Sequence, residues 1–145
     1  MPLSSDEREL IRTSFRAVSW ASQSAADRFY AILFEEAPQT RELFVNDLEQ
    51  QGAQLMSKLS LIVSEIQDIE GLLPVLEDLA LRHVAYGVKP EHYPLVGSAL
   101  LRMLEEFLGE DFTPEIRNAW TKAYSELSAL MIKSAYSHVG ADSAS

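Results

Sequence analysis

The chain has 145 residues, of which 22 are acidic and 12 are basic, so its net charge is −10. This length fits one domain, and a hydrophobic fraction of 47% is enough to build a core. The acidic balance disfavours binding to nucleic acid or to an anionic membrane surface, and the absence of cysteine excludes disulfides, thiolate metal ligands and thiol nucleophiles.

Targeting and membrane signals are missing from the pattern. No apolar run approaches the roughly 20 residues that cross a bilayer as a helix. The first ten residues, MPLSSDEREL, turn acidic at once and contain no apolar signal core. We therefore expect a cytoplasmic protein that does not enter a membrane.

Helical periodicity dominates the first half of the chain. Ser4 and Glu7 have the spacing of a capping box, which predicts a helix beginning after Ser4. A second helix is predicted over residues 22–36, because Pro38 disfavours helix in the residue before it. After a short turn that ends at Phe44, a third helix is predicted from about Asn46 to Ile66.

The second half continues the same pattern. A helix is predicted over residues 72–86, ended by Gly87, and another over residues 90–108, started by Pro90 and ended by Gly109. Thr113 followed by proline begins the last helix. The pattern shows no strand alternation, so we predict an all-α fold of six or seven helices, with a domain at residues 1–138 and a flexible tail at 139–145.

Packing roles are assigned to most large side chains. Two tryptophans and two tyrosines are expected in the core or at its edge, namely Trp20, Trp120, Tyr86 and Tyr124. Three methionines are expected to pack, namely Met56, Met103 and Met131. His138, near the end of the chain, is expected at the surface.

His83 shares an apolar helix face with Leu76, Leu79 and Ala80. In one interpretation it is a core histidine that donates its ring N–H to a carbonyl. In the other, one ring nitrogen bonds the Leu79 carbonyl and the second is a neutral metal ligand. Periodicity alone leaves both open.

Two further polar residues stand among apolar neighbours on separate helices. Tyr30 lies between Phe29 and Leu33, and Gln51 precedes Leu55 by one turn. A single polar residue of this kind is most often satisfied or exposed. Three of them on three helices are better explained if they converge on one site.

Long segments of the chain resemble the globins, in the branch of bacterial single-domain globins, flavohaemoglobin haem domains and neuroglobin. LLPVLEDLALR followed by HVAYGVKPEHYPLVG is similar to the proximal segment of that family, and FYAILFEEAPQTRELF to the distal segment. FTPEIRNAWTKAYSELSALM resembles the last globin helix. The resemblance covers about residues 5–135 and implies a globin fold of six to eight helices around one haem b.

The resemblance also implies roles for individual residues. His83 matches the histidine that binds the haem iron, while Tyr30 and Gln51 match the distal residues that hydrogen-bond a gaseous ligand. Residues implied to contact the haem are Phe44, Leu55, Leu79, Arg82, Val88, Tyr93 and Val96. Gln50 and Gln54 are alternatives to Gln51, and a solvated side chain is the alternative for Arg82. His92 could touch a haem propionate, and Met56 is a weaker candidate than Gln51 for a sixth iron ligand.

One position departs from the family pattern. In flavohaemoglobins a glutamate of the last helix pairs with the proximal histidine and tyrosine, and the matching position here is Ala135. We expect no flavin or nicotinamide domain after the last helix, so catalysis would need an external reductase. The resemblance implies binding of O2, NO and CO, and two distal donors suit nitric oxide detoxification better than oxygen transport. The alternatives are a gas or redox sensor and a haem-free globin-like interaction module.

Overall fold

The computed structural model describes residues 3–44, 47–68, 70–85 and 87–144, and it describes no side chains at 70, 85 and 136–144. The expected positions of Tyr86 and of the His138 side chain therefore lie outside the described residues. The division into a domain at 1–138 and a tail at 139–145 stays a prediction, and the backbone of the last helix continues to Ala144.

The described residues form six α-helices and three short 3-10 helices, without a strand. The α-helices are α1 (Ser5–Ser19), α2 (Ser22–Glu36), α3 (Leu48–Ser64), α4 (Leu73–Ala85), α5 (His92–Leu108) and α6 (Pro114–Ala144). The 3-10 helices are η1 (Pro38–Leu43), η2 (Glu70–Leu72) and η3 (Gly109–Asp111). The predicted all-α fold is confirmed.

Local chemistry explains several helix ends. Ser4 Oγ accepts from the Glu7 amide at 3.1 Å while Glu7 Oε1 accepts from the Ser4 amide at 2.8 Å, which completes the predicted capping box. Thr113 Oγ1 accepts from the Ile116 amide at 3.2 Å at the start of α6. Gly87 has a φ of 90°, a backbone conformation that favours glycine.

The start of α5 differs from the prediction by two residues. Pro90 lies in a turn, and α5 begins at His92. The amides of His92 and Tyr93 bond the carbonyls three residues back, and His92 Nδ1 accepts from the Lys89 amide at 2.9 Å. The hydrogen bonds of this turn occupy polar groups that a helix beginning at Pro90 would otherwise use.

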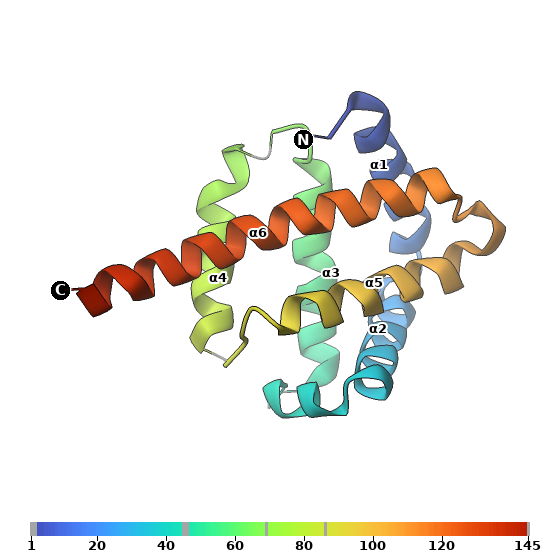
Figure 1. Cartoon of the computed structure of the whole chain (residues 1–145). Helices are drawn as coiled ribbons and strands as arrows, with labels where there is room; N and C mark the ends of the chain where they lie inside the picture. Colours follow the sequence, from blue (N-terminus) through green and yellow to red (C-terminus); the bar gives the residue numbers. More distant parts are fainter. Residues whose placement is uncertain (1–2, 45–46, 69, 86, 145) are drawn as a thin grey trace.

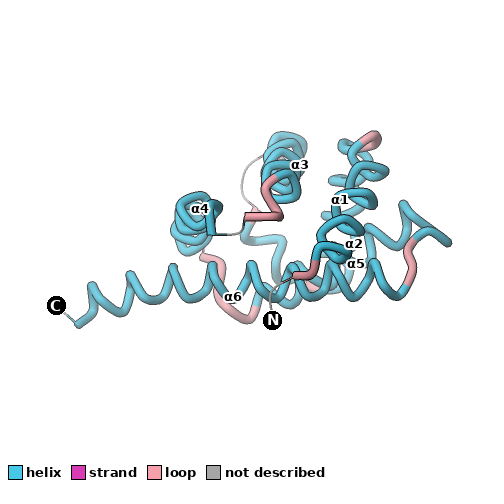
Figure 2. The backbone as a smooth tube through the Cα atoms, turned by 90° about the horizontal axis from the view of Figure 1, so that it is seen from above, coloured by secondary structure: helices cyan, strands magenta, loops and turns pink. Residues whose placement is uncertain are grey.

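Two long helices cross the others. Figure 1 shows α6 running across α4 and α3 and α5 running across α3, and the view from above shows α3 and α4 nearly end-on (Figure 2). The packing agrees, because α6 contacts α1, α4 and α5, while α2 packs on α3 and α5. Two ion pairs, Arg28–Glu106 at 2.8 Å and Arg102–Glu36 at 2.7 Å, also join α2 to α5.

The core is divided into two clusters. The larger cluster lies between α1, α2, α3, α5 and the first half of α6, and includes Phe15, Leu33 and Trp120. The smaller cluster joins α4 to the second half of α6 and to the first turn of α5, through residues such as Leu76, Tyr93 and Met131. α4 therefore belongs to a different core cluster from most of α3, and Ile62 of α3 packs against both clusters.

The four aromatic residues expected in the core have different outcomes. Trp120 is buried and its Nε1 donates to Ser14 Oγ at 2.8 Å. Trp20, in contrast, is 86% exposed, so its expected place in the core was wrong. It follows the last buried position of α1, Val18, and lies in the turn before α2, off the face that Ile11 and Phe15 bury.

Within the described part of the chain, no helix combines the length and the apolar character that a membrane span requires.

Candidate functional site

Helix α3 has two apolar faces with different burial. One face is fully buried against α1 and α2 and carries Gly52, Met56 and Val63. The other face is a half-buried stripe at helical spacing, made of Leu48, Gln51, Leu55, Leu59 and Ile62. Half-buried leucines in a continuous stripe indicate a surface that is suited to an additional apolar partner.

Helices α3 and α4 are consecutive but make few contacts with one another. α3 packs on α1 and α2, whereas α4 packs on α6 and η2. The two helices are antiparallel in Figure 1, so the first turn of α3 and the last turn of α4 lie at the same edge of the pair. Gln51 belongs to that first turn and His83 to that last turn.

His83 is held as a neutral imidazole. Its Nδ1 lies 2.6 Å from the Leu79 carbonyl oxygen, the contact that the metal-ligand interpretation named and that the core interpretation also allows. Burial lowers the pKa of His83 below its ordinary value, and this effect outweighs the Leu79 hydrogen bond, which raises the pKa. With Nδ1 donating to Leu79, Nε2 carries the free lone pair that a metal needs.

Tyr30 is buried in an aromatic group between α2 and the end of η1. Its ring centroid lies 5.2 Å from that of Phe44 and 6.0 Å from that of Phe34. Burial raises the pKa of Tyr30 to about 12, so its hydroxyl remains protonated near neutral pH. No described residue accepts a hydrogen bond from it.

Gln51 is adjacent to this aromatic group. A Cβ built on the next residue, Gly52, would lie 3.6 Å from Tyr30 Cε2, so the start of α3 touches the Tyr30 ring. Gln51 Oε1 is buried and has no hydrogen-bond partner among the described residues. Gln50 and Gln54, the alternatives, are both exposed.

The corner after α4 meets η1 close to Phe44. A Cβ built on Gly87 would lie 3.8 Å from Leu43 Cδ2. The amide of Val88 donates to the His83 carbonyl at 2.9 Å, which turns the chain just past the histidine. The end of α4 that carries His83 is therefore near the segment that carries Phe44.

The remaining predicted residues have different surroundings. Leu55, Leu79, Val88 and Val96 are half-buried at the edges of the two core clusters. Arg82 does not join this half-buried group, because it pairs with Asp78 at 3.0 Å and its side chain is 66% exposed. Met56 faces a cavity of about 330 Å³ that Phe15 and Gly52 also line, on the α1 and α2 side of α3.

The surroundings of Tyr93 are apolar on the side of α6. Ala135, at the position of the expected carboxylate, is 1% exposed and lies in the same cluster as Tyr93. The rings of Tyr93 and His83 are stacked with their centroids 6.2 Å apart.

Sequence reasoning gave Tyr124 only a packing role, yet its hydroxyl donates to the Tyr93 carbonyl at 2.7 Å. A glycine one turn after Tyr93, Gly97, was the available signal for this close helix contact.

These residues do not form a suitable site for a metal ion without a cofactor. Among the described residues, no three His, Asp or Glu side chains gather into a group that could hold one. A single neutral imidazole near apolar helix faces instead suits a metal that a flat, apolar macrocycle already coordinates. Together with the all-α fold, this arrangement is compatible with a helical haem protein.

Comparison with known families gives the same answer. The family model described as Globin matches residues 27–131, and the chain belongs to the globin family. Curated relatives include the flavohemoproteins of Bordetella parapertussis, 35% identical over 90% of this chain, and of Pseudomonas aeruginosa, 33% identical over 90%. The chain spans only about a third of each of them, 33% and 34%.

Solved structures of similar size share the fold. An engineered carbene transferase derived from a candidate nitric oxide dioxygenase of Rhodothermus marinus has a TM-score of 0.87 and 33% identity, and 99% of each chain is covered. A bacterial globin from Campylobacter jejuni has a TM-score of 0.83 over 94% of this chain and 99% of that one. Its identity of 22% supports the fold alone.

Membership of the globin family implies haem binding, and the residues present fit that group. His83 supplies a neutral nitrogen, and the half-buried stripe of α3 supplies apolar surface for a porphyrin face. Gln51 carries a buried polar atom without a partner, which a ligand beside the haem would satisfy.

Proposed function

We propose that this globin binds haem b through His83, takes up O2, NO and CO, and converts NO to nitrate with electrons from a separate reductase in the cytoplasm. Phe44, Leu55, Leu79, Val88, Tyr93 and Val96 would contact the haem. Arg82 would reach a propionate only after leaving Asp78.

One observation carries the proposal. Tyr30 and Gln51 are polar residues at the α2–α3 contact, and Gln51 Oε1 is buried without a hydrogen-bond partner among the described residues. A buried polar group without a partner costs about 1–3 kcal/mol. A ligand that hydrogen-bonds with Gln51 would recover this free energy.

The two side chains would act as donors. Haem, when bound, supplies an iron that binds a diatomic gas and exchanges electrons. The Tyr30 hydroxyl keeps its proton because its pKa is about 12, and a turn of the Gln51 amide presents its NH2 group where Oε1 now lies. Two donors slow the release of oxygen, which favours its reaction with NO over its transport.

The reaction balances with one electron: NO and O2 combine with an electron to give nitrate. The chain spans about a third of the flavohemoproteins that it resembles, and a related flavohemoglobin from Malassezia yamatoensis is described with bound FAD and haem. A separate flavin-dependent reductase is the electron source that this proposal names.

The test begins with haem uptake. The purified chain should take up hemin, and His83→Ala should lose the spectrum of a histidine-ligated haem. Mixing the ferrous, oxygenated protein with NO should then yield one nitrate per NO. A chain that refuses hemin would instead support the haem-free interaction module.

Oxygen release tests the distal role of Tyr30. Removal of one hydrogen bond of about 1–3 kcal/mol should speed oxygen dissociation from Tyr30→Phe at least several-fold. Stopped-flow displacement by CO measures this rate. Phe34→Leu, which alters the same aromatic group without removing a hydroxyl, is the control and should change the rate far less. An unchanged rate in Tyr30→Phe would remove Tyr30 from the site.

A further inference from the structure

We propose that Tyr124 is a positioning residue for His83, and that it acts through the backbone of Tyr93. The inference rests on the proposed role of His83 as the iron ligand. It concerns three elements that meet at one point: the last turn of α4, the first turn of α5 and the middle of α6.

The contacts form a short chain. The Tyr124 hydroxyl on α6 donates to the Tyr93 carbonyl oxygen on α5 at 2.7 Å. The Tyr93 ring in turn stacks on the His83 ring, with an interplanar angle of 20° and a centroid separation of 6.2 Å. A displacement of the first turn of α5 would therefore move the ring that lies against His83.

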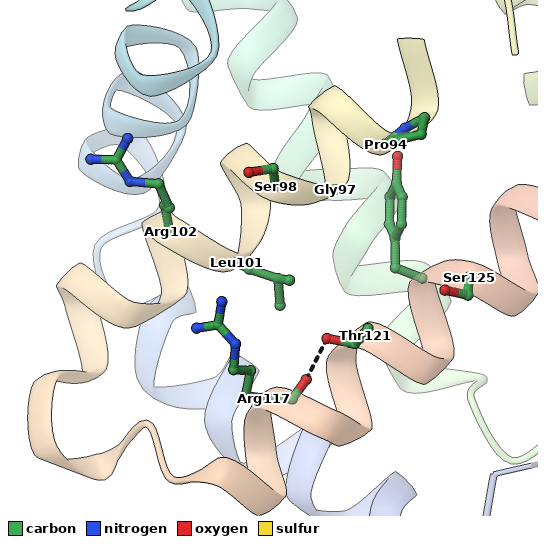
Figure 3. A pocket seen from close by; sticks show the side chains of 9 residues that line it. Pro94, Gly97, Ser98, Leu101, Arg102, Arg117, Thr121 and Ser125 are labelled. Atoms are coloured by element: carbon green, nitrogen blue, oxygen red, sulfur yellow. Dashed lines mark hydrogen bonds between the residues drawn. The ribbon is translucent and has the colours of Figure 1, made fainter. Parts of the chain in front are cut away.

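Gly97 allows this arrangement. A Cβ at Gly97 would lie 2.7 Å from Tyr124 Cε2 and 2.9 Å from Cδ2, closer than real side-chain contacts. The Tyr124 ring thus rests directly on the backbone of α5, one turn after Tyr93. Figure 3 shows this α5–α6 face, with Pro94 and Gly97 on one helix and Thr121 and Ser125 on the other.

Packing alone does not fix the Tyr124 ring. The same ring lines a cavity of about 300 Å³ between α5 and α6, together with Leu101 and Thr121, so one side of it has space. Burial raises the pKa of the Tyr124 hydroxyl, which therefore remains a donor. Unlike the apolar contacts, the hydrogen bond is directional, so it restrains the orientation of the Tyr124 ring.

The neighbours of Tyr93 in the smaller core cluster are apolar. They include Leu76, Met131 and Ala135. Ala135 offers no carboxylate in that cluster. The backbone bond from Tyr124 is a directional tie on the residue that stacks against His83.

The experiment uses the haem-loaded ferrous chain and the variant Tyr124→Phe, which removes only the hydroxyl. Resonance Raman spectroscopy should show a shifted or broadened iron–histidine stretching band. The C–O stretch of the CO complex, which reports Tyr30 and Gln51, should stay unchanged. A loss of fold in general would alter both bands.

A matched control is available at another hydrogen bond that α6 makes. Ser14→Ala removes the acceptor of the Trp120 bond, which at 2.8 Å ties α6 to α1. This variant should lose stability and keep the wild-type iron–histidine band. Gly97→Ala keeps the hydroxyl but displaces the ring, and it should move the band as Tyr124→Phe does.

The outcomes separate the two proposals. If the wild-type chain takes up no haem, the proposed function fails. If haem binds through His83 but the iron–histidine band is unmoved in both Tyr124→Phe and Gly97→Ala, the function stands and the positioning role of Tyr124 is overturned. Equal shifts in Ser14→Ala and Tyr124→Phe would overturn it as well.

Discussion

Three glutamines occupy the first two turns of α3, and only Gln51 turns inward. Gln50 and Gln54 are exposed, although all three have the same chemistry. The sequence alone left them as alternatives, because the match of Gln51 to the family assumed that the resemblance has no gap over residues 46–50. The Asp47 side chain accepts from the Glu49 amide at 3.1 Å, which sets the start of the helix and hence the direction of Gln51.

The unpaired Oε1 predicts an effect of Gln51→Leu in the haem-free protein. Replacement of a buried polar group without a partner by an apolar one should raise the free energy of unfolding by about 1 kcal/mol. Urea denaturation measures it. The control is Gln54→Leu, on the exposed face, which should change stability by less than about 0.5 kcal/mol. Equal effects in both variants would contradict the assignment.

His83 predicts a pH dependence of the haem-free protein. Burial lowers the pKa of His83 in the folded state below the ordinary 6.5, so the unfolded chain binds the proton more readily. Stability is therefore full above pH 6.5 and falls as the pH drops below it. Urea midpoints at about pH 7.5 and 5.5 measure this loss. His83→Leu should reduce the difference.

At the scale of elements, the crossing of α2 and α3 depends on small residues. A Cβ on Gly52 would lie 2.9 Å from the Cβ of Ala26, which is fully buried. The close approach brings the Tyr30 ring to the first turns of α3. The crossing therefore sets the separation between the two distal side chains.

This contact makes Gly52→Ala a test of the crossing. Strain of about 1–3 kcal/mol should exceed the helix-propensity gain of about 1 kcal/mol, so the protein should lose stability. In the background of Ala26→Gly, which removes the opposing methyl group, the same change should cost less or become favourable. Urea denaturation of the four proteins measures the coupling, and additive effects would contradict the contact.

Helix existence was predictable where periodicity and caps agreed. The capping box at Ser4, the end of α2 before Pro38 and the glycine after α4 each follow from local chemistry. Trp20 was not predictable in the same way, because an apolar residue beyond the last buried position carries no signal of its direction. The contact of Tyr124 with Tyr93 joins residues 31 positions apart, which periodicity cannot reveal.

At the scale of the whole molecule, the divided core distinguishes two packing units. Most helices share the larger cluster, whereas α4 depends on α6, η2 and the first turn of α5. The resemblance implied a haem bound by His83, which lies on α4, with Gln51 of α3 as a distal residue. The structure adds that α4 has few other partners, which the sequence pattern did not indicate.

Removal of haem should therefore affect one unit more than the other. Amide hydrogen exchange in the haem-free protein should accelerate in α4 and in the first turns of α3, while α1, α2 and the first half of α6 remain protected. Mass spectrometry of haem-loaded and haem-free protein measures this difference. A uniform increase along the chain would show that the two clusters unfold as one.

The two tryptophans, which are the chain's full complement, occupy opposite environments: Trp20 is 86% exposed, and Trp120 is 4% exposed with its Nε1 bonded to Ser14. Indole fluorescence consequently contains a component that a water-borne quencher such as acrylamide reaches and another that it does not. Porphyrin absorbs in the region where both indoles emit. Quenching of the shielded emission during a hemin titration would thus report binding without any label.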